Sequence, residues 1–380
     1  MTKSGGASPD FEAEGLLEGL SGTAREGRLR LLERLYQEGV SLEDLRRAVQ
    51  EDRLAILPAE RVLAVEANYT AREVAQQASI ELNVFLAQQR AAGLSIPTED
   101  ERAYSDADVA AARRLRDAFE AGLTREAMLK GARVFGQVTS QAAAAARALV
   151  GESFIKPGDT ELELALRYEA AARTLHPQTV RTLEYLYDAH LREQLRGAAI
   201  AAADLAAGHV AGTREVSVCF ADLVGFTRLG EEVASEDLGE IADRLSMLAQ
   251  EAAQHPVSLV KTIGDAAMLV SAEAEALLES ALWLVRAAEN EGEGFPLLKA
   301  GVALGEALNR WGDWYGSPVN LASRVTAIAR PSSVLATRDV RRSAGDRFAW
   351  SFAGRRLLKG MREEVALYRC RLPEDVPRRG

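Results

Sequence analysis

The spacing of apolar residues changes once along the chain, at about residues 205–213. Before this point, segments such as GRLRLLERLYQEG and TELELALRYEAAARTLH place apolar residues three and four apart, which predicts amphipathic helices. After it, short β-rich runs such as EVSVCFADL and AAMLVSA alternate with helical stretches. We therefore predict an all-α domain over residues 1–204, a linker over 205–213 and an α+β domain over 214–380.

The order of the predicted elements in residues 214–380 indicates one sheet architecture. A strand, a long helix, a strand, a tight turn, a strand, a helix and a strand follow one another from EVSVCFADL to LLKAGVALG. This order is typical of the ferredoxin-like, split βαβ arrangement. In that arrangement the first strand lies beside the hairpin KTIGD in the sheet. The predicted fold class is therefore multidomain, all-α followed by α+β.

Composition places the chain among soluble globular proteins, because 47% of its 380 residues are apolar and 27% are charged. The opening residues contain no apolar segment of a signal peptide, and no later window of about 18 residues is apolar throughout. We expect neither secretion nor a membrane span, and a cytoplasmic location. Cys219 and Cys370 lie inside apolar runs, without the spacing of a zinc site or a disulfide framework. We expect both to be small buried hydrophobic residues.

The segment YTAREVAQQASIELNVFLAQQRAAGL predicts a helix, a turn and a second helix, and a tyrosine-containing wing and a further helix follow. In this order of elements, residues 69–128 resemble the winged helix-turn-helix of mercuric-resistance-type regulators. Arg90 is the one basic residue between Ser79 and Gly93, and Glu81 adds repulsion, so the contacts of a DNA reader are missing. The net charge of −10 also disfavours phosphate-backbone binding. We expect a helical scaffold for protein contacts and no nucleic-acid partner.

Ionisable residues interrupt the second half at four places where structure alone does not require them. They lie in the stretches FADLVGFT (220–227), KTIGDAAM (261–268), WGDWYGSPVNLASR (311–324) and LLKGMREEVALYR (357–369). Each has an ordinary explanation by itself. Asp222 could cap a helix, Asp265 could form a hairpin turn and Lys359 could be a solvated charge.

Together, the four stretches supply the groups that phosphoryl transfer with two divalent ions requires. Asp222 and Asp265 are expected at the ends of neighbouring strands, and carboxylates are the ligands that hard cations such as Mg²⁺ prefer. The N–H groups of the turn that follows Asp222 can donate to a phosphate oxygen. These N–H groups belong to Val224, Gly225, Phe226 and Thr227. We therefore expect a nucleotide site at this end of the sheet.

In order and in spacing, these stretches resemble the catalytic domain of the class III nucleotidyl cyclases, from about Glu215 to Arg371. The resemblance implies that Asp222 and Asp265 bind two Mg²⁺ or Mn²⁺ ions in each active site. It also assigns roles to five further residues. Lys261 and Asp313 select the purine, Asn320 orients the ribose, Arg324 stabilises the transition state, and Lys359 contacts the triphosphate.

The implied substrate is ATP, and the implied products are 3′,5′-cyclic AMP and pyrophosphate. Adenine offers a ring-nitrogen acceptor and an amine donor, which match the Lys261 donor and the Asp313 acceptor, whereas guanine shows the opposite pattern. Because one chain contains every one of these residues, the resemblance further implies a homodimer with two equivalent sites at its interface. The alternatives are a guanylate cyclase and a nucleotide-sensing transcriptional regulator that uses residues 69–128.

Residues 1–204 resemble, in layout, the helical regulatory domain of soluble actinobacterial cyclases, some of which respond to acid. The segment from about Leu191 to Thr213 enters the first catalytic strand, so its packing could decide whether two catalytic domains close on each other. We expect autoinhibition by this domain. His176, His190 and His209 precede or occupy the connecting region. One of them could act as a pH switch, and ordinary surface histidines are the other interpretation.

Overall fold

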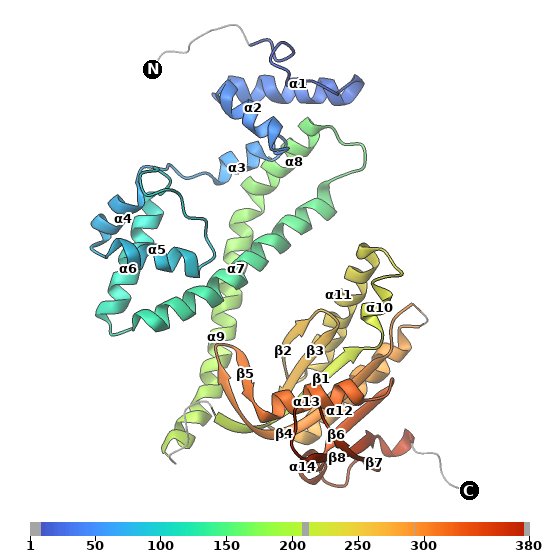
Figure 1. The fold of residues 1–380 in the computed structure, drawn as a ribbon. Coiled ribbons are helices and arrows are strands. Elements are labelled where there is room, and N and C mark those ends of the chain that lie inside the picture. Colours follow the sequence, from blue (N-terminus) through green and yellow to red (C-terminus); the bar gives the residue numbers. More distant parts are fainter. Residues whose placement is uncertain (1–8, 207–212, 293, 376–380) are drawn as a thin grey trace. The chain divides into compact units, whose positions relative to one another are not determined.

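The computed structural model describes residues 9–206, 213–292 and 294–375, and the chain divides into two units, residues 1–195 and 196–380 (Figure 1). Residues 207–212 hold most of the predicted linker over 205–213, together with His209, and lie outside the described residues. The domain boundary near residue 204 therefore stays a prediction. Among the helices of the described residues, none combines the length and the apolar character that crossing a membrane requires.

The first unit consists of helices, as the three- and four-residue spacing predicts. Several begin at side-chain caps. Thr70 and Thr160 each form a capping box with the glutamate three residues later, which satisfies backbone N–H groups at the start of the helix. The helices are α1 (Gly22–Gln37), α2 (Leu42–Gln50), α3 (Leu57–Leu63), α4 (Ala71–Ala78), α5 (Leu82–Ala91), α6 (Asp106–Glu120), α7 (Arg125–Phe154), α8 (Glu161–Thr174) and α9 (His176–Ala206), the last of which continues into the second unit.

Two apolar cores stabilise this unit. The first forms where α1 packs with α2 and α8, and it buries Leu31 and Leu35 completely. Arg34 of α1 also donates to Glu169 of α8 at 2.6 Å, so a charged contact lies beside this core. The second core forms between α4, α5 and α6 around residues such as Phe85. The helical half of the chain therefore contains two separately packed groups of helices.

The segment that resembles a helix-turn-helix folds around the second core. Ser79 caps the C-terminal end of α4 with a left-handed backbone of φ 57°, and α5 begins three residues later. Tyr69 and Tyr104 form an antiparallel bridge that joins the segment before α4 to the segment before α6. α5 has Arg90 as its one basic residue. A role as a scaffold for protein contacts stays a prediction.

The second unit is a mixed sheet with helices on both faces (Figure 1). Its strand order is β2–β3–β1–β4–β6–β8–β7, with β5 paired to β4. The first four strands follow the ferredoxin-like order, so the predicted α+β fold class is confirmed. The strands are β1 (Thr213–Leu223), β2 (Ser258–Ile263), β3 (Ala266–Ser271), β4 (Leu298–Arg310), β5 (Asp313–Gly316), β6 (Ser333–Thr337), β7 (Ala349–Leu357) and β8 (Glu364–Arg371). The helices are α10 (Phe226–Leu229), α11 (Ser235–Ala252), α12 (Ala274–Asn290), α13 (Ser317–Ile328), α14 (Arg338–Ser343) and the 3₁₀ helix η1 (Pro373–Asp375).

Side chains of β1 alternate between the two faces of the sheet. Cys219 and Leu223 belong to the core that α11 and α12 cover. Val218 and Phe220 instead pack in the core under α13. Asp222 continues this second series, so it lies on the side of the sheet that we call the α13 face.

Both cysteines are buried and free. Burial raises the pKa of the Cys219 thiol to about 12 and that of the Cys370 thiol to about 12. Both thiols therefore stay protonated at neutral pH. The prediction that they are small buried hydrophobic residues is confirmed.

Candidate active site

Asp222 and Asp265 lie at the same end of neighbouring strands. In the antiparallel pairing of β1 with β3, Asp222 is opposite Ala266. The Leu223 N–H donates to the Asp265 carbonyl at 2.9 Å. The prediction that the first strand neighbours the KTIGD hairpin is therefore confirmed. Both aspartates are half-buried, so this end of the sheet contains two partly desolvated carboxylates.

The surroundings of Asp222 oppose its negative charge. Burial raises the pKa of this carboxyl, the hydrogen bond and charge of Lys299 lower it, and the charge of Asp265 raises it again, so that the pKa is raised overall. Lys299 stands directly opposite Asp222 on β4, and its Nζ lies 3.2 Å from Asp222 Oδ2. Sequence reasoning missed Lys299. The one available signal was a lysine near the start of the apolar run LLKAGVALG.

The aspartate pair suits a hard divalent cation. Two neighbouring, partly buried carboxylates concentrate negative charge that a cation would offset, and oxygen atoms are the ligands that Mg²⁺ and Mn²⁺ prefer. In the part of the chain that the structure describes, no group of three or more His, Cys, Asp or Glu side chains is placed to hold a metal. Further ligands would therefore be backbone carbonyls, water or substrate phosphates, as is usual for Mg²⁺.

The turn after β1 offers backbone N–H groups. Gly225 has φ 77°, a region that glycine favours, and it directly precedes α10. Among the described residues, the N–H groups of Gly225, Phe226 and Thr227 donate to no protein acceptor. The Val224 N–H, in contrast, donates to the Leu297 carbonyl at 2.8 Å. The expectation of a phosphate contact is therefore wrong for Val224 and stays a prediction for the other three.

Lys261 and Asp313 contact each other although they are 52 positions apart in the sequence. The lysine Nζ donates to Asp313 Oδ2 at 2.5 Å, and the Trp314 N–H donates to Asp313 Oδ1 at 2.9 Å. A tight turn at Trp311 and Gly312, both with positive φ, pairs β5 with β4 and positions Asp313. The structure thus brings together the donor and the acceptor to which base selection is assigned.

Asn320 and Arg324 lie one turn apart on α13 and share one face of the helix. Arg324 Nη1 is 3.0 Å from Met361 Sδ, and Gly360 lies beside the same guanidinium. Lys359 directly precedes these two residues in the loop between β7 and β8, and its side chain is exposed. The structure therefore brings the α13 pair and the Lys359 loop together.

The close packing of α13 depends on Gly301 of β4. A Cβ at this position would lie 2.3 Å from the Thr326 backbone nitrogen and 2.6 Å from its Oγ1. We expect Gly301→Ala to push α13 away from the sheet and to lower the free energy of unfolding by about 1 to 3 kcal/mol. Catalytic activity should fall as well, because α13 carries Asn320 and Arg324. Urea unfolding and a rate assay measure the two effects.

The matched control for this substitution is Gly239→Ala in α11. Nothing lies within 4 Å of a Cβ added at Gly239, and alanine forms helices better than glycine does. Stability should stay equal or increase in the control. An equal loss of stability in both variants would contradict the packing role of Gly301.

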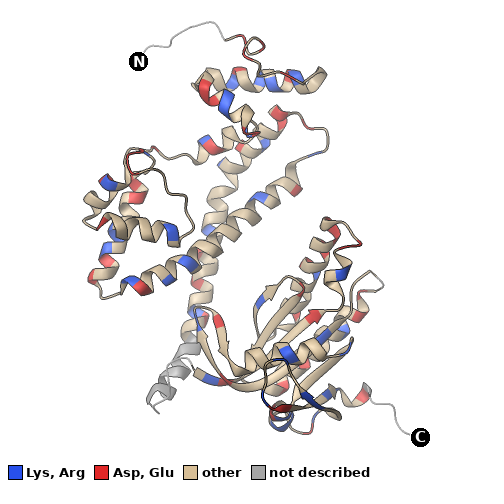
Figure 2. Cartoon of the chain, in the orientation of Figure 1, with Lys and Arg blue, Asp and Glu red and all other residues tan. Residues whose placement is uncertain are grey.

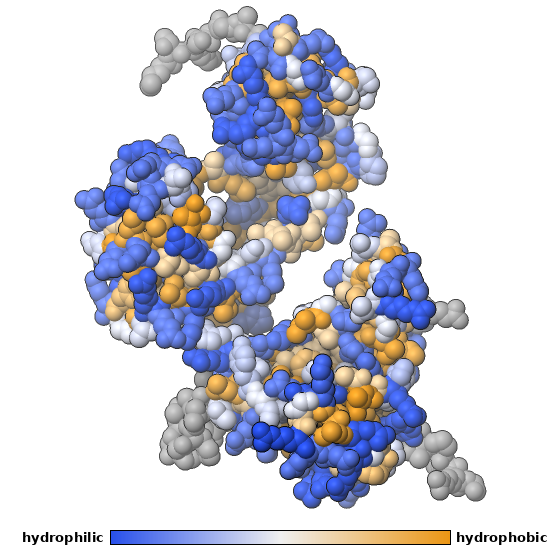
Figure 3. Space-filling model, viewed as in Figure 1, coloured by the Kyte–Doolittle hydropathy of each residue, from blue (hydrophilic) through white to orange (hydrophobic). Residues whose placement is uncertain are grey.

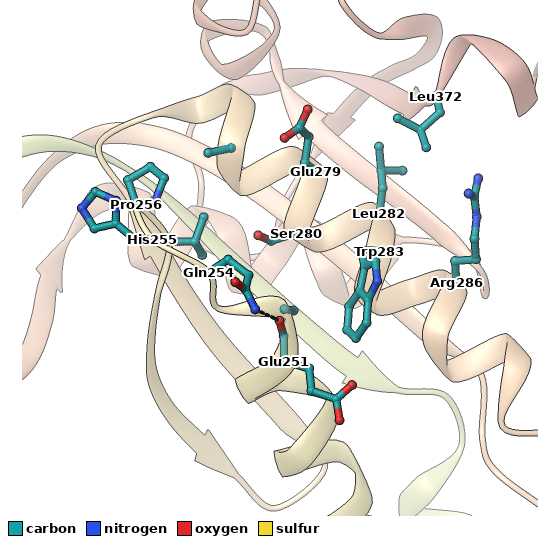
Figure 4. Close-up of a pocket in the computed structure, with 13 residues that line it drawn as sticks. Glu251, Gln254, His255, Pro256, Glu279, Ser280, Leu282, Trp283, Arg286 and Leu372 are labelled. Atoms are coloured by element: carbon teal, nitrogen blue, oxygen red, sulfur yellow. Dashed lines mark hydrogen bonds between the residues drawn. The ribbon is translucent and has the colours of Figure 1, made fainter.

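A pocket of about 730 Å³ lies in another part of this unit, between the end of α11 and α12 (Figure 4). Trp283 of α12 lines it together with Pro256 and Leu372. The Gln254 side chain donates to the Glu251 carbonyl at 3.1 Å on its wall. None of the candidate site residues lines this pocket, so they form a site of their own outside it.

Two family models match the chain. Residues 9–195 match the adenylate cyclase regulatory domain, and residues 209–290 match the adenylate and guanylate cyclase catalytic domain. These matches identify a nucleotidyl cyclase catalytic domain that follows a helical regulatory domain.

Relatives specify the family further. A pH-sensitive adenylate cyclase of Mycobacterium tuberculosis is 39% identical over 370 residues, which cover 95% of this chain and 92% of the relative. An adenylate cyclase of Streptomyces coelicolor is 33% identical over 294 residues, which cover 75% of this chain and 74% of the relative. Among solved structures, an adenylyl cyclase from P. aeruginosa matches 44% of this chain and 96% of its own, with 21% identity and a TM-score of 0.37. The chain belongs to the adenylate cyclase family, and the predicted resemblance is confirmed.

Proposed function

We propose that this protein converts ATP to 3′,5′-cyclic AMP and pyrophosphate in the cytoplasm. The arrangement of charged groups in the second unit supports the proposal most directly. It combines the carboxylates of Asp222 and Asp265, the Lys261–Asp313 pair, and α13 beside the Lys359 loop. No observation favours a guanylate cyclase or a transcriptional regulator instead.

Each group has a chemical task in the attack of the ribose 3′-hydroxyl on the α-phosphorus. The attack forms one oxygen–phosphorus bond and breaks the bond to the leaving pyrophosphate. Divalent ions held by Asp222 and Asp265 would make the 3′-hydroxyl more acidic and would offset the negative charge of the phosphates. Arg324 presents a planar set of donors to the α-phosphoryl oxygens as charge develops there. Asn320 orients the ribose, and Lys359 offsets charge on the leaving group.

Lys261 and Asp313 recognise the base in this proposal. Their contact of 2.5 Å shows that one donor and one acceptor lie within reach of the same small group. Adenine would insert between them, with a ring nitrogen that accepts from Lys261 and an exocyclic amine that donates to Asp313. Guanine would leave both side chains without a suitable partner, which disfavours GTP.

The active form in this proposal is a homodimer with the sites at its interface. The two hairpins that carry Lys261 and Asp313 expose large apolar side chains, with Ile263 55%, Trp311 47% and Tyr315 56% exposed. Apolar residues also reach the surface of this unit in Figure 3. Exposed apolar side chains around polar groups are typical of protein interfaces. A second copy of the chain would cover them and supply the other half of each site.

Formation of cyclic nucleotide by the purified full chain tests the proposal. ATP should give cyclic AMP in the presence of Mg²⁺ or Mn²⁺, GTP should give much less cyclic GMP, and EDTA should stop both reactions. Absence of cyclic AMP with either ion across pH 5 to 8, about the range in which histidine titrates, would overturn the proposal.

Regulation by the helical unit gives a separate prediction. The two units have separate cores, so a fragment of residues 210–380 should fold and escape autoinhibition. We expect its activity to exceed that of the full chain by about 5-fold or more, a typical size for coupling between sites, and to depend less on pH. Equal activities and equal pH profiles would contradict this. His176 and His190 are exposed on α9, and replacing each by Ala in the full chain tests whether either one sets the pH response.

A further inference from the structure

A second cavity of the catalytic unit, about 250 Å³ in volume, lies at the ends of β6 and β8. Lys and Arg residues gather around α14, β7 and β8 (Figure 2). Four arginines line this cavity: Arg286 belongs to α12, Arg330 follows α13 closely, and Arg369 and Arg371 lie at the end of β8. None of the candidate active-site residues lines it. We call Arg330, Arg369 and Arg371 the arginine cluster.

Arg369 is held in a position that leaves one of its donors without an acceptor. It lies on β8 between Leu335 of β6 and Ser351 of β7, so its backbone is fixed on both sides. Its Nε is buried, and among the described residues it has no hydrogen-bond partner. A buried donor without an acceptor opposes folding, and such groups in native proteins commonly indicate a ligand, an ion or a water molecule.

The charges around Arg369 are also unbalanced. Within the described ranges, none of the three cluster arginines forms an ion pair with a carboxylate. Burial lowers the pKa of Arg369, and the positive charges of Arg371 and Arg330 lower it further. Glu289 and Arg286 of α12 also line the cavity, so the lining as a whole is positive. Like charges held together at a partly buried position favour an anion between them.

We propose that the arginine cluster binds a small phosphate-type oxyanion. Guanidinium groups present paired N–H donors that match two oxygens of a phosphate, and this geometry is stronger and more specific than a lysine contact. A cavity of about 250 Å³ has room for an inorganic phosphate or pyrophosphate but is small for a whole nucleotide. The ligand would accept from the outer guanidinium N–H groups of the cluster and place its negative charge between three positive ones.

Binding there would connect two parts of the catalytic unit. Arg330 follows the last residue of α13 by two positions, and Arg369 and Arg371 belong to the sheet. A phosphate between them would hold the end of α13 against β8. The same helix carries Asn320 and Arg324, so the ligand would bind outside the active site and still contact the element that positions two of its residues.

Thermal unfolding of the full chain tests the proposal, with inorganic phosphate as the probe, EDTA in all samples and sodium chloride at equal ionic strength as the reference. Phosphate should raise the Tm by about 3 to 5 °C at ten times its dissociation constant. Arg369→Gln should abolish this rise. It should not lower the Tm in chloride, because the substitution removes a repelled charge.

Two control variants separate the cluster from other effects of phosphate. Arg355→Gln removes an exposed arginine of β7 outside the cavity and should keep the full rise in Tm. Lys359→Ala removes the cation that we place at the triphosphate and should also keep it. The proposal is overturned if phosphate and chloride give the same Tm for the unaltered chain, if Arg369→Gln keeps the rise, or if Lys359→Ala loses it.

A direct measurement covers the case in which Arg369→Gln does not fold. Calorimetric titration of phosphate into the unaltered chain should show binding, and Arg371→Gln should weaken that binding by about 10-fold or more, as expected for the loss of a charge-assisted contact. Absence of measurable binding to the unaltered chain, or unchanged affinity in Arg371→Gln, would contradict the proposal.

Discussion

A mixture of Asp265→Ala and Lys261→Ala chains should recover about one quarter of the activity of the unaltered protein, although each variant alone is nearly inactive. We expect each single variant to lose activity about 100-fold or more, because one lacks a metal ligand and the other lacks a base contact. In a homodimer with shared sites, Asp265 serves one site and Lys261 serves the other. A heterodimer then contains one intact site and one doubly altered site.

The expected recovery follows from random pairing in a symmetric dimer. Equal amounts of the two chains give about one half heterodimers, and each heterodimer has one working site of two, which gives about one quarter of full activity. Cyclic AMP formation after mixing measures it, and size-exclusion chromatography of differently tagged chains confirms that heterodimers are present.

A matched control mixes Asp222→Ala with Asp265→Ala. Both residues lie at the same end of β1 and β3, and our proposal assigns both to the metal-binding half of one site. Each site of this heterodimer would therefore lack one of its two metal ligands. No activity should return. Recovery in the control, or no recovery in the first mixture although heterodimers form, would show that the sites are not shared in the way we propose.

Much of the catalytic unit could be predicted because its signals are local. Asp222 ends an alternating apolar strand, and Asp265 follows Gly264 in a tight hairpin turn, so both could be assigned to strand ends without knowledge of the sheet. The ferredoxin-like order then places these strands side by side, as the pairing of β1 with β3 confirms. The pairing of Lys261 with Asp313 across two hairpins agrees with the roles implied by the motifs, and those roles stay predictions.

Features that depend on strand register or on distant packing could not be predicted. Lys299 stands opposite Asp222 because β1 and β4 pair in one particular register, and the sequence alone does not define that register. The Val224 N–H is taken by a carbonyl from the loop before β4, which the motif around Val224 does not reveal. The arginine cluster likewise combines residues from the end of α13 and the end of β8.

In the helical unit, the type of element was predictable and the packing was not. Apolar spacing and caps such as Thr70 identify the helices. The same spacing does not tell which helices share a core, because many helices present similar apolar faces. The separate cores around Leu31 and around Phe85 therefore emerge only from the structure.

The double variant Lys261→Glu with Asp313→Asn should change the base preference of the enzyme. The introduced carboxylate would be an acceptor where the natural chain has the Lys261 donor, and the introduced amide would supply a donor in place of the Asp313 carboxylate. Guanine has the carbonyl acceptor and ring N–H donor that fit this reversed pattern. We expect the ratio of kcat/KM for ATP to that for GTP to fall by about 100-fold or more, because buried groups without partners strongly penalise the wrong base.

Lys359→Ala is the matched control for base preference, because triphosphate is common to both nucleotides. Lys359 is exposed in the loop next to Arg324, away from the Lys261–Asp313 contact in our assignment, so its loss should lower the rates with ATP and GTP by similar factors and leave their ratio unchanged. If the ratio of kcat/KM for ATP to that for GTP stayed constant in the double variant but shifted in Lys359→Ala, our assignment would be reversed. Lys359 would then recognise the base, and the Lys261–Asp313 pair would not. The comparison of ratios thus separates recognition of the base from recognition of the phosphates, even if both variants are slow.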